Sequence, residues 1–281
     1  MKRRRVLCLP LLLAAPMAGA AGRRIVSLGG TVTEIVYALQ AGDRLVGVDD
    51  SSFYPPAAAK LPRVGYYRSF SVEGIASLRP DLILASDQAG PPHAMAQLRL
   101  LGKPIVILPS SPEVDALVQA IDRIAAALDL APRGEQLARQ VRDGVARATG
   151  HHRPERAPRV LLLSSHTGKL QAAGRDTAAD AMLTLAGADN VFAGHNGYKA
   201  ISAEAVAALK PDAIVTTTMS LRAVGGAAAF SAQPGIAVTP AARNGRVVVI
   251  DDLLLLGFGP RLPEALRLLR TGLSGRAASG G

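Results

Sequence analysis

The sequence has no tryptophan, few other aromatic residues and a single cysteine, Cys8, among its 281 residues. Cys8 lies in an amino-terminal segment with a basic start at residues 2–5, a short apolar stretch and small residues around Ala18 and Ala20. This is the pattern of a cleavable secretory signal peptide, and the apolar stretch is too short to cross a membrane as a helix. We therefore expect residues 1–21 to be removed and the mature protein to be exported.

Without Cys8 the mature chain has no cysteine, which excludes disulfides, thiolate metal sites and a cysteine nucleophile. The nucleophile motif G-x-S-x-G and the zinc motif H-E-x-x-H do not occur in the sequence. The five histidines are not arranged at the spacing of a metal cluster. The sequence therefore contains no recognisable catalytic centre.

The basic residues are scattered along the chain and do not form runs. The formal net charge is +10, and loss of the signal peptide leaves 28 of the 32 basic residues against 22 acidic ones. Aromatic residues do not alternate with the basic ones, so we do not expect nucleic-acid binding. A modest positive balance suits an anionic small ligand.

Short apolar runs recur between segments with helical periodicity. Runs of this length, rich in leucine and β-branched residues, are typical of buried parallel strands. They occur at residues 24–28, 45–49, 82–86, 104–108, 159–165, 213–218 and 246–251. The pattern predicts an α/β fold with central parallel sheets.

A long helical stretch at about 113–149 separates the strand runs into two groups. We expect two Rossmann-like lobes joined by a long backbone helix. The expected parts are a first lobe at 22–130, the linking helix at 131–157, a second lobe at 158–274 and a disordered tail at 275–281.

The two halves contain a repeat. Residues 71–86 match residues 202–217 at seven of sixteen positions, and each copy reads as a serine-capped helix, a Pro-Asp break and a buried strand. Such corners are common in α/β proteins, but the shared spacing favours two pseudo-equivalent lobes. A further cap is predicted at Thr31, followed three residues later by Glu34 as in a capping box.

An exported protein with two α/β lobes and a helical link resembles the helix-linked class of periplasmic substrate-binding proteins, which deliver siderophores, corrinoids, haem or metal ions to ABC importers. The resemblance covers essentially the whole mature chain. Within the class, the segments VGYYRSFSVEGIASLRPDLILAS (64–86), AAGRDTAADAMLTLAGADNVF (172–192) and GYKAISAEA (197–205) are similar to the haem-binding branch. The resemblance implies a monomer in the periplasm that binds haem in an interlobe cleft and catalyses no reaction.

Two adjacent tyrosines are the candidate iron ligands. Tyrosine phenolate is a hard ligand that suits ferric haem iron. In the family, the tyrosine directly after Val-Gly is the ligand, which here is Tyr66, and Arg68 would contact a haem propionate. Aligning the repeat without a gap instead sets Tyr67 and Arg68 opposite Tyr198 and Lys199. We expect Tyr66 to bind the iron, with Tyr67 as the alternative.

Two residues of the second lobe complete the expected site. By resemblance, Arg222 would reach across the cleft and hydrogen-bond the phenolate, although an exposed loop arginine is an equal alternative. His166 follows a buried strand at its carboxyl end, where α/β sheets place their ligand crevices. Some haem-binding relatives use a histidine near this position as a ligand, and a role in the crevice wall without ligation is equally consistent.

The paired glutamates of the repeat, Glu73 and Glu204, stand in the first turn of their helices, where a negative charge stabilises the positive helix end. In the resembling class, one such glutamate on each lobe docks onto the two-fold symmetric ABC permease, which works with ATPase subunits. The two glutamates are therefore candidate docking residues.

Two alternative functions stay open. The same class could carry a ferric siderophore or a corrinoid, whose sites favour arginines or aromatics without an iron-binding tyrosine. The chain could instead be an exported α/β enzyme, haem-degrading or hydrolytic, against which the missing nucleophile motif counts.

Overall fold

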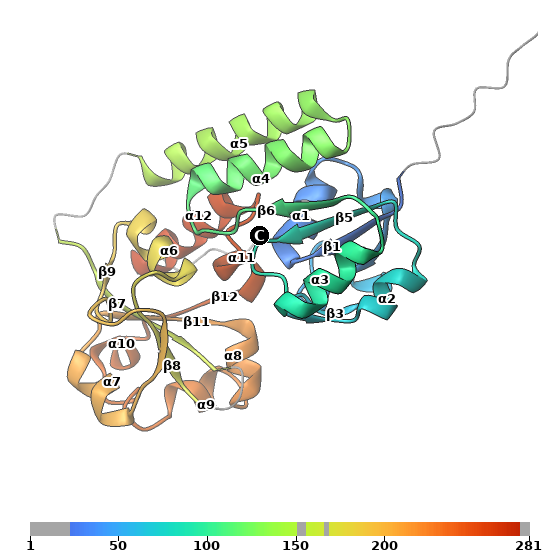
Figure 1. The fold of residues 1–281 in the computed structure, drawn as a ribbon. Helices are drawn as coiled ribbons and strands as arrows, with labels where there is room; N and C mark the ends of the chain where they lie inside the picture. The colour runs from blue at the N-terminus through green and yellow to red at the C-terminus, as the bar shows by residue number, and fades with distance from the viewer. Residues whose placement is uncertain (1–22, 151–155, 166–168, 276–281) are drawn as a thin grey trace, which may run out of the picture.

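The computed structural model describes residues 23–150, 156–165 and 169–275. Its elements form two α/β lobes with a pair of helices across the top (Figure 1). The expected signal peptide and His166 lie outside the described residues, as does most of the expected tail. Among the helices described, none is long and apolar enough to cross a membrane.

The first lobe is built on a four-stranded parallel sheet in the order β2-β1-β5-β6. A two-stranded hairpin, β3–β4, forms a separate small sheet next to the end of β2. The elements are β1 (Ile25–Leu28), α1 (Gly30–Ala38), β2 (Leu45–Val48), β3 (Gly65–Tyr66), β4 (Ser69–Phe70), α2 (Val72–Ser77), β5 (Leu82–Ser86), α3 (Pro92–Leu100) and β6 (Ile105–Leu108), with 3₁₀ turns at Gly42–Arg44 and Ala58–Lys60.

Two helices follow the first lobe, α4 (Val114–Ala127) and α5 (Ala131–Thr149). Both show helical spacing of buried apolar residues along one face. They pack closely because Gly134 of α5 faces Ala125 of α4, where even a Cβ atom on the glycine would come within 2.4 Å of the alanine Cβ. The linking segment is therefore a helical pair.

The second lobe has a six-stranded sheet in the order β10-β8-β7-β11-β12, with β9 beside β7. Strands β7, β11 and β12 are parallel, whereas β8 pairs antiparallel with β7 and β10. The elements are β7 (Arg159–Ser164), β8 (Gln171–Ala173), α6 (Ala178–Ala186), β9 (Asp189–Asn190), β10 (Tyr198–Ala200), α7 (Ala203–Leu209), β11 (Ala213–Thr217), α8 (Thr218–Ala223), α9 (Ala227–Ser231), α10 (Pro240–Arg243), β12 (Val247–Ile250), α11 (Asp252–Leu256) and α12 (Leu262–Leu273).

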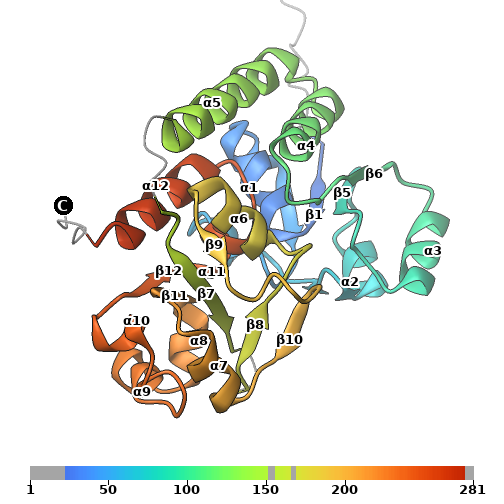
Figure 2. The same ribbon diagram turned by 90° about the vertical axis from the view of Figure 1, so that its left-hand side faces the viewer.

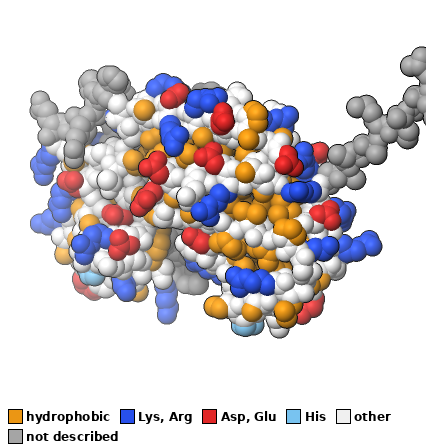
Figure 3. Space-filling model, turned by 45° about the horizontal axis from the view of Figure 1, so that its top comes forward, with side chains coloured by type: hydrophobic (Ala, Val, Ile, Leu, Met, Phe, Trp, Pro, Cys, Tyr) orange, Lys and Arg blue, Asp and Glu red, His pale blue; other side chains and the backbone are white. Residues whose placement is uncertain are grey.

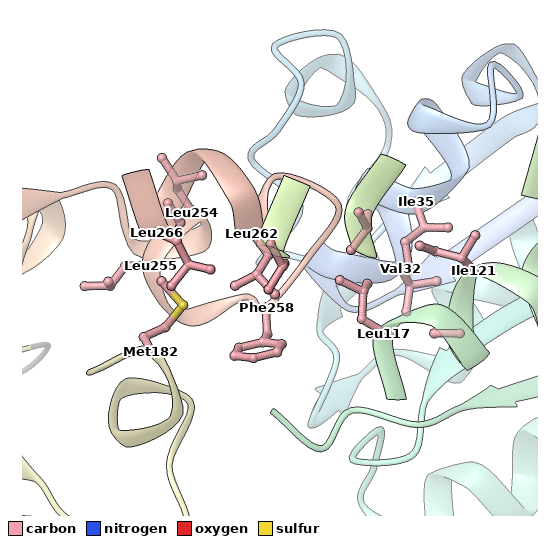
Figure 4. Packing of buried hydrophobic residues seen from close by; sticks show 14 of the residues in the cluster. Val32, Ile35, Leu117, Ile121, Met182, Leu254, Leu255, Phe258, Leu262 and Leu266 are labelled. Atoms are coloured by element: carbon pink, nitrogen blue, oxygen red, sulfur yellow. The ribbon is translucent and has the colours of Figure 1, made fainter. Parts of the chain in front are cut away.

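One hydrophobic core runs through both lobes. It joins Val32 and Ile35 of α1 to Leu117 and Ile121 of α4, and continues to residues of the second lobe such as Leu266 of α12 (Figure 4). The outer faces of the two sheets bury separate clusters. Because the lobes share this core, the space between them is bounded by packed elements.

All seven expected strand runs are strands, displaced at their ends by at most one residue. The repeat is also confirmed. Ser71 accepts a hydrogen bond from the Gly74 N–H at the start of α2, and Ser202 accepts one from Ala205 at the start of α7. Strands β5 and β11 then follow these helices.

The capping box at Thr31 and Glu34 is wrong. Helix α1 begins one residue earlier, with Gly29 as its cap and no capping side chain. The Thr31 hydroxyl donates to the Gly257 carbonyl at 2.5 Å, and Glu34 binds Arg261. Both side chains therefore reach the carboxy-terminal segment of the chain, a long-range partner that a local pattern does not reveal.

Candidate functional site

A cavity of about 960 Å³ lies between the lobes. Its walls come from both, including the carboxyl ends of β1, β5 and β6 in the first lobe and of β7 in the second. Carboxyl ends of parallel strands are the usual place for a ligand crevice in α/β sheets. The volume lies at the upper end of the range typical of small-molecule sites.

The β3–β4 hairpin brings the two adjacent tyrosines to this cavity. Tyr66, Tyr67 and Arg68 all line it, and the Tyr66 side chain is 41% exposed. The two phenol rings pack edge to face with centroids 4.6 Å apart, and the Arg68 guanidinium lies 5.1 Å from the Tyr67 ring centroid. Arg68 also donates a hydrogen bond to the Gln88 side chain. The hairpin thus presents two phenols and one cation side by side.

The buried carboxylate of Asp49 fixes this hairpin to the first sheet. Its Oδ2 accepts from the Tyr67 N–H at 3.3 Å and from the Ser51 hydroxyl at 2.6 Å, while its Oδ1 accepts from the Gly29 N–H at 3.0 Å. Asp49 is fully buried at the end of β2. One side chain therefore joins the backbone of the tyrosine hairpin to the end of β1.

The two tyrosines differ in environment. Tyr67 is half-buried and packs against the outer core of the first lobe. Burial first, and then the neighbouring Tyr66 phenol, raise the pKa of Tyr67 well above the ordinary tyrosine value, against a smaller opposing effect of Arg68. Ionising Tyr67 is therefore costly in the protein, and Tyr66 is the more open of the pair.

The second lobe contributes Tyr198, which stands on β10 and lines the same cavity. Burial raises the pKa of Tyr198 to about 12, so its phenol is protonated at neutral pH. The repeat-related tyrosines of the two lobes are therefore brought to one cavity.

Other expected residues lie elsewhere. Arg222 is exposed in the last turn of α8 and is not among the cavity-lining residues that the structure describes. Glu73 and Glu204 are exposed on α2 and α7, which lie far from α5, on separate lobes (Figure 1). The pKa of Glu204 is lowered by hydrogen bonds from its own backbone N–H and from Ser202.

Several cavity residues carry no sequence signal. Phe53 is 57% exposed in the loop after β2, and Met219 is 42% exposed at the start of α8. Asp252, Leu253 and Phe258 line the cavity from a carboxy-terminal segment that was expected only to complete the second lobe. Each of these residues lies in a loop or near a helix end, where the periodicity of the sequence does not indicate which way a side chain faces.

The described residues contain no group of three or more histidine, cysteine or acidic side chains that could hold a bare metal ion. Basic and acidic side chains are intermixed on the face that carries the helical pair (Figure 3). The described residues that line the large cavity are mainly apolar, together with phenols, one guanidinium and a few carboxylates.

These features define a two-lobed binding protein, and the chain belongs to the periplasmic binding protein family, whose model matches residues 25–254. The ABC transporter substrate-binding lipoprotein YvrC of Bacillus subtilis is 30% identical over 253 residues, 88% of this chain and 78% of the relative. A vitamin B12-binding protein of Yersinia pseudotuberculosis is 32% identical over 217 residues, 76% of each chain.

Among solved structures, the fold is similar to the periplasmic haem-binding protein RhuT from Roseiflexus sp. RS-1, with a TM-score of 0.86 and 42% identity over 91% of this chain and 99% of RhuT. It is also similar to the periplasmic haem-binding protein BhuT in complex with two haems, with a TM-score of 0.85 and 41% identity over 92% of this chain and all of BhuT. Both similarities extend over more than nine tenths of this chain, whose two lobes and helical pair are seen from the side in Figure 2.

Proposed function

We propose that this chain binds haem in the interlobe cavity and delivers it to an ABC permease. The observation that carries the proposal is the Tyr66–Arg68 hairpin at the wall of a cavity of about 960 Å³. The likeness to the haem-binding proteins RhuT and BhuT supports it. The protein would act before import, in the periplasm, after removal of residues 1–21.

Tyr66 would supply the iron bond. A free phenol has a pKa of about 10 and must lose its proton to bind ferric iron at neutral pH. The positive iron favours this loss, and the Arg68 guanidinium adds to the local positive charge. Tyr67 is the weaker candidate because burial and its neighbour both oppose its ionisation. Tyr67 would then form the wall beside the ligand.

The remaining contacts follow from the shape of haem, an apolar disc with two carboxylates on one edge. Phe53, Leu253 and Leu256 offer apolar surface in the cavity. Arg68, at the exposed rim of the hairpin, would pair with a propionate. Tyr198 would contact the macrocycle from the second lobe as a neutral phenol.

Two further proposed contacts, from Arg222 and His166, involve residues that are not among the described residues lining the cavity. Arg222 would need its long side chain to reach back from the far end of α8 to the phenolate. His166, outside the described residues, would need to face the iron from beyond the end of β7 to act as a second ligand. Both stay proposals, and separate Arg222→Ala and His166→Ala variants test them by their effect on the absorption spectrum of bound hemin.

Delivery would use one acidic contact on each lobe. Glu73 and Glu204 occupy equivalent first-turn positions of α2 and α7, and both are exposed. A two-lobed ligand that meets a two-fold symmetric permease needs an equivalent group on each lobe. The pair supports docking to a permease homodimer that carries ATPase subunits, with the binding protein as a monomer.

A corrinoid is the second candidate cargo. Asp50, Asp176 and Asp252 line the cavity, and Arg68 is the one basic side chain among the described lining residues. Carboxylates accept hydrogen bonds from the amide groups of a corrin, whereas they repel haem propionates. The relative from Yersinia is a vitamin B12-binding protein.

Parallel titrations of the mature protein with hemin and with cyanocobalamin separate the two cargoes. The proposal expects a saturable Soret shift with hemin and no binding of cyanocobalamin by calorimetry. Binding of cyanocobalamin with no Soret shift at equimolar hemin would establish the corrinoid alternative instead. Bound hemin should also be recovered as intact haem after incubation with a mild reductant and oxygen, because degradation to released products would indicate an enzyme.

A further inference from the structure

Met219 is the feature of the cavity that the proposed function leaves without a role. The other methionines of the described residues, Met95 and Met182, are buried in the two lobes with 6% and 0% exposure. Met219 is 42% exposed and lines the cavity from the start of α8. Met219 therefore supplies the one thioether, among the methionines that the structure describes, that a ligand in the cavity can reach.

The backbone at Met219 is firmly held. Its N–H donates to Asp252 Oδ2 at 2.8 Å, and the Thr218 hydroxyl donates to the same oxygen at 3.2 Å. On the other side, the Ser220 hydroxyl accepts from the Ser165 N–H at 2.9 Å and bonds the Thr217 hydroxyl at 2.7 Å. The flanking residues are therefore fixed, while the Met219 side chain stays exposed.

The other Asp252 oxygen, Oδ1, is buried and has no hydrogen-bond partner among the described residues. Asp252 itself lines the cavity. The described residues therefore leave this oxygen unpaired, and an unpaired buried oxygen is costly. The α8 wall thus carries a carboxylate directly beside the Met219 backbone.

Tyr66 and Met219 belong to opposite lobes and line one cavity. In Figure 1 the β3 hairpin and α8 stand on the two sides of the space between the lobes. A flat macrocycle held between them would turn one face toward each. A phenolate oxygen prefers ferric iron, whereas a thioether is a soft ligand that raises the reduction potential of haem iron by favouring the ferrous state.

We propose that Met219 is an iron ligand on the second lobe, specific for ferrous haem. The inference rests on the proposed function, because it takes haem as the cargo. When a one-electron reductant converts Fe(III) to Fe(II), the iron–oxygen bond to Tyr66 breaks and the phenol takes a proton from water. A sulfur lone pair of Met219 then forms the new bond to iron. The first lobe would thus ligate ferric haem through Tyr66, and the second lobe would ligate ferrous haem through Met219.

The test compares wild type with Met219→Leu, which keeps the apolar volume and removes the sulfur. Met182→Leu, in the buried core, is the matched control. With dithionite as reductant, the Met219 variant should bind ferrous haem at least tenfold more weakly while its ferric affinity is unchanged. A tenfold loss specific to one oxidation state lowers the midpoint potential by about 59 mV.

The outcomes are distinct. An equal loss of ferric and ferrous affinity means that Met219 only packs against the porphyrin and overturns the assignment, as does a midpoint potential like that of wild type. A ferrous defect found in His166→Ala and not in Met219→Leu assigns the bond to the histidine and also overturns it. Failure of wild type to bind hemin at all contradicts the proposed function itself and is seen before any variant is compared.

Discussion

The Arg261 guanidinium binds the Glu34 carboxylate with two parallel hydrogen bonds, each 3.0 Å long. Glu34 lies on α1 of the first lobe and is 3% exposed, while Arg261 directly precedes α12. The guanidinium also stacks on the Tyr54 ring, 3.5 Å from its centroid. The pair therefore ties the carboxy-terminal segment to the first lobe, next to the segment that forms one cavity wall.

Replacing Arg261 by alanine should destabilise the protein by about 3–5 kcal/mol, because it leaves the Glu34 carboxylate buried without its partner. Burial already raises the pKa of Glu34, so the unpaired acid would take up a proton more readily still. Arg139→Ala is the control, since Arg139 and Glu135 form an exposed ion pair at 3.7 Å. Such pairs contribute about 0–1 kcal/mol. Urea unfolding measures both variants, and equal losses would contradict the assigned role of the buried pair.

Tyrosine ionisation should be spread over a wide pH range. Tyr198 has a pKa of about 12 because of burial, and an ordinary phenol has a pKa of about 10. The folded state thus holds this proton more tightly than the unfolded state. Its stabilising contribution is present below pH ~10 and is lost as the pH rises through about 12. Alkaline titration of tyrosinate absorbance should therefore lose a late-ionising group in Tyr198→Phe, whereas loss of an early one would contradict the raised pKa of this phenol.

Charge reversal at Glu73 or Glu204 should impair delivery without affecting capture. Both carboxylates are exposed and away from the cavity lining, so hemin affinity should match that of wild type. Haem uptake by cells that depend on this protein should fall, and fall further in the double variant. Asp143→Lys on α5 is the control, since it reverses another exposed acid on a helix far from α2 and α7. Normal uptake with both glutamates reversed would show that they serve only as helix-end charges.

The strands and the repeat could be predicted because their signals are local. Each apolar run is long enough to identify a buried strand, and Ser71 and Ser202 cap helices within three residues of themselves. Glu34 shows where this approach fails. Its spacing from Thr31 fits a capping box, but a partner 227 residues away binds it instead.

Part of the lining of the candidate site could be predicted where the sequence carries a motif. Tyr66, Tyr67 and Arg68 stand in one contiguous segment, and the repeat pointed to Tyr198; all four line the cavity. Phe53, Met219 and Asp252 had no motif, because their position in the cavity depends on how the loop after β2 and the start of α8 and α11 meet in space. Arg222 was placed by likeness alone, and the structure leaves its side chain outside the cavity lining.

The most direct test of haem capture through Tyr66 is the absorption spectrum of the ferric hemin complex in wild type, Tyr66→Phe and Tyr67→Phe. Tyr37→Phe, which removes a phenol on α1 outside the cavity lining, is the control. The account predicts that only Tyr66→Phe loses the spectrum of a tyrosine-ligated ferric haem, with at least a tenfold loss of affinity, about 1.4 kcal/mol. A wild-type spectrum in both Tyr66→Phe and Tyr67→Phe would contradict tyrosine ligation, and a change in Tyr67→Phe alone would transfer the iron bond to Tyr67.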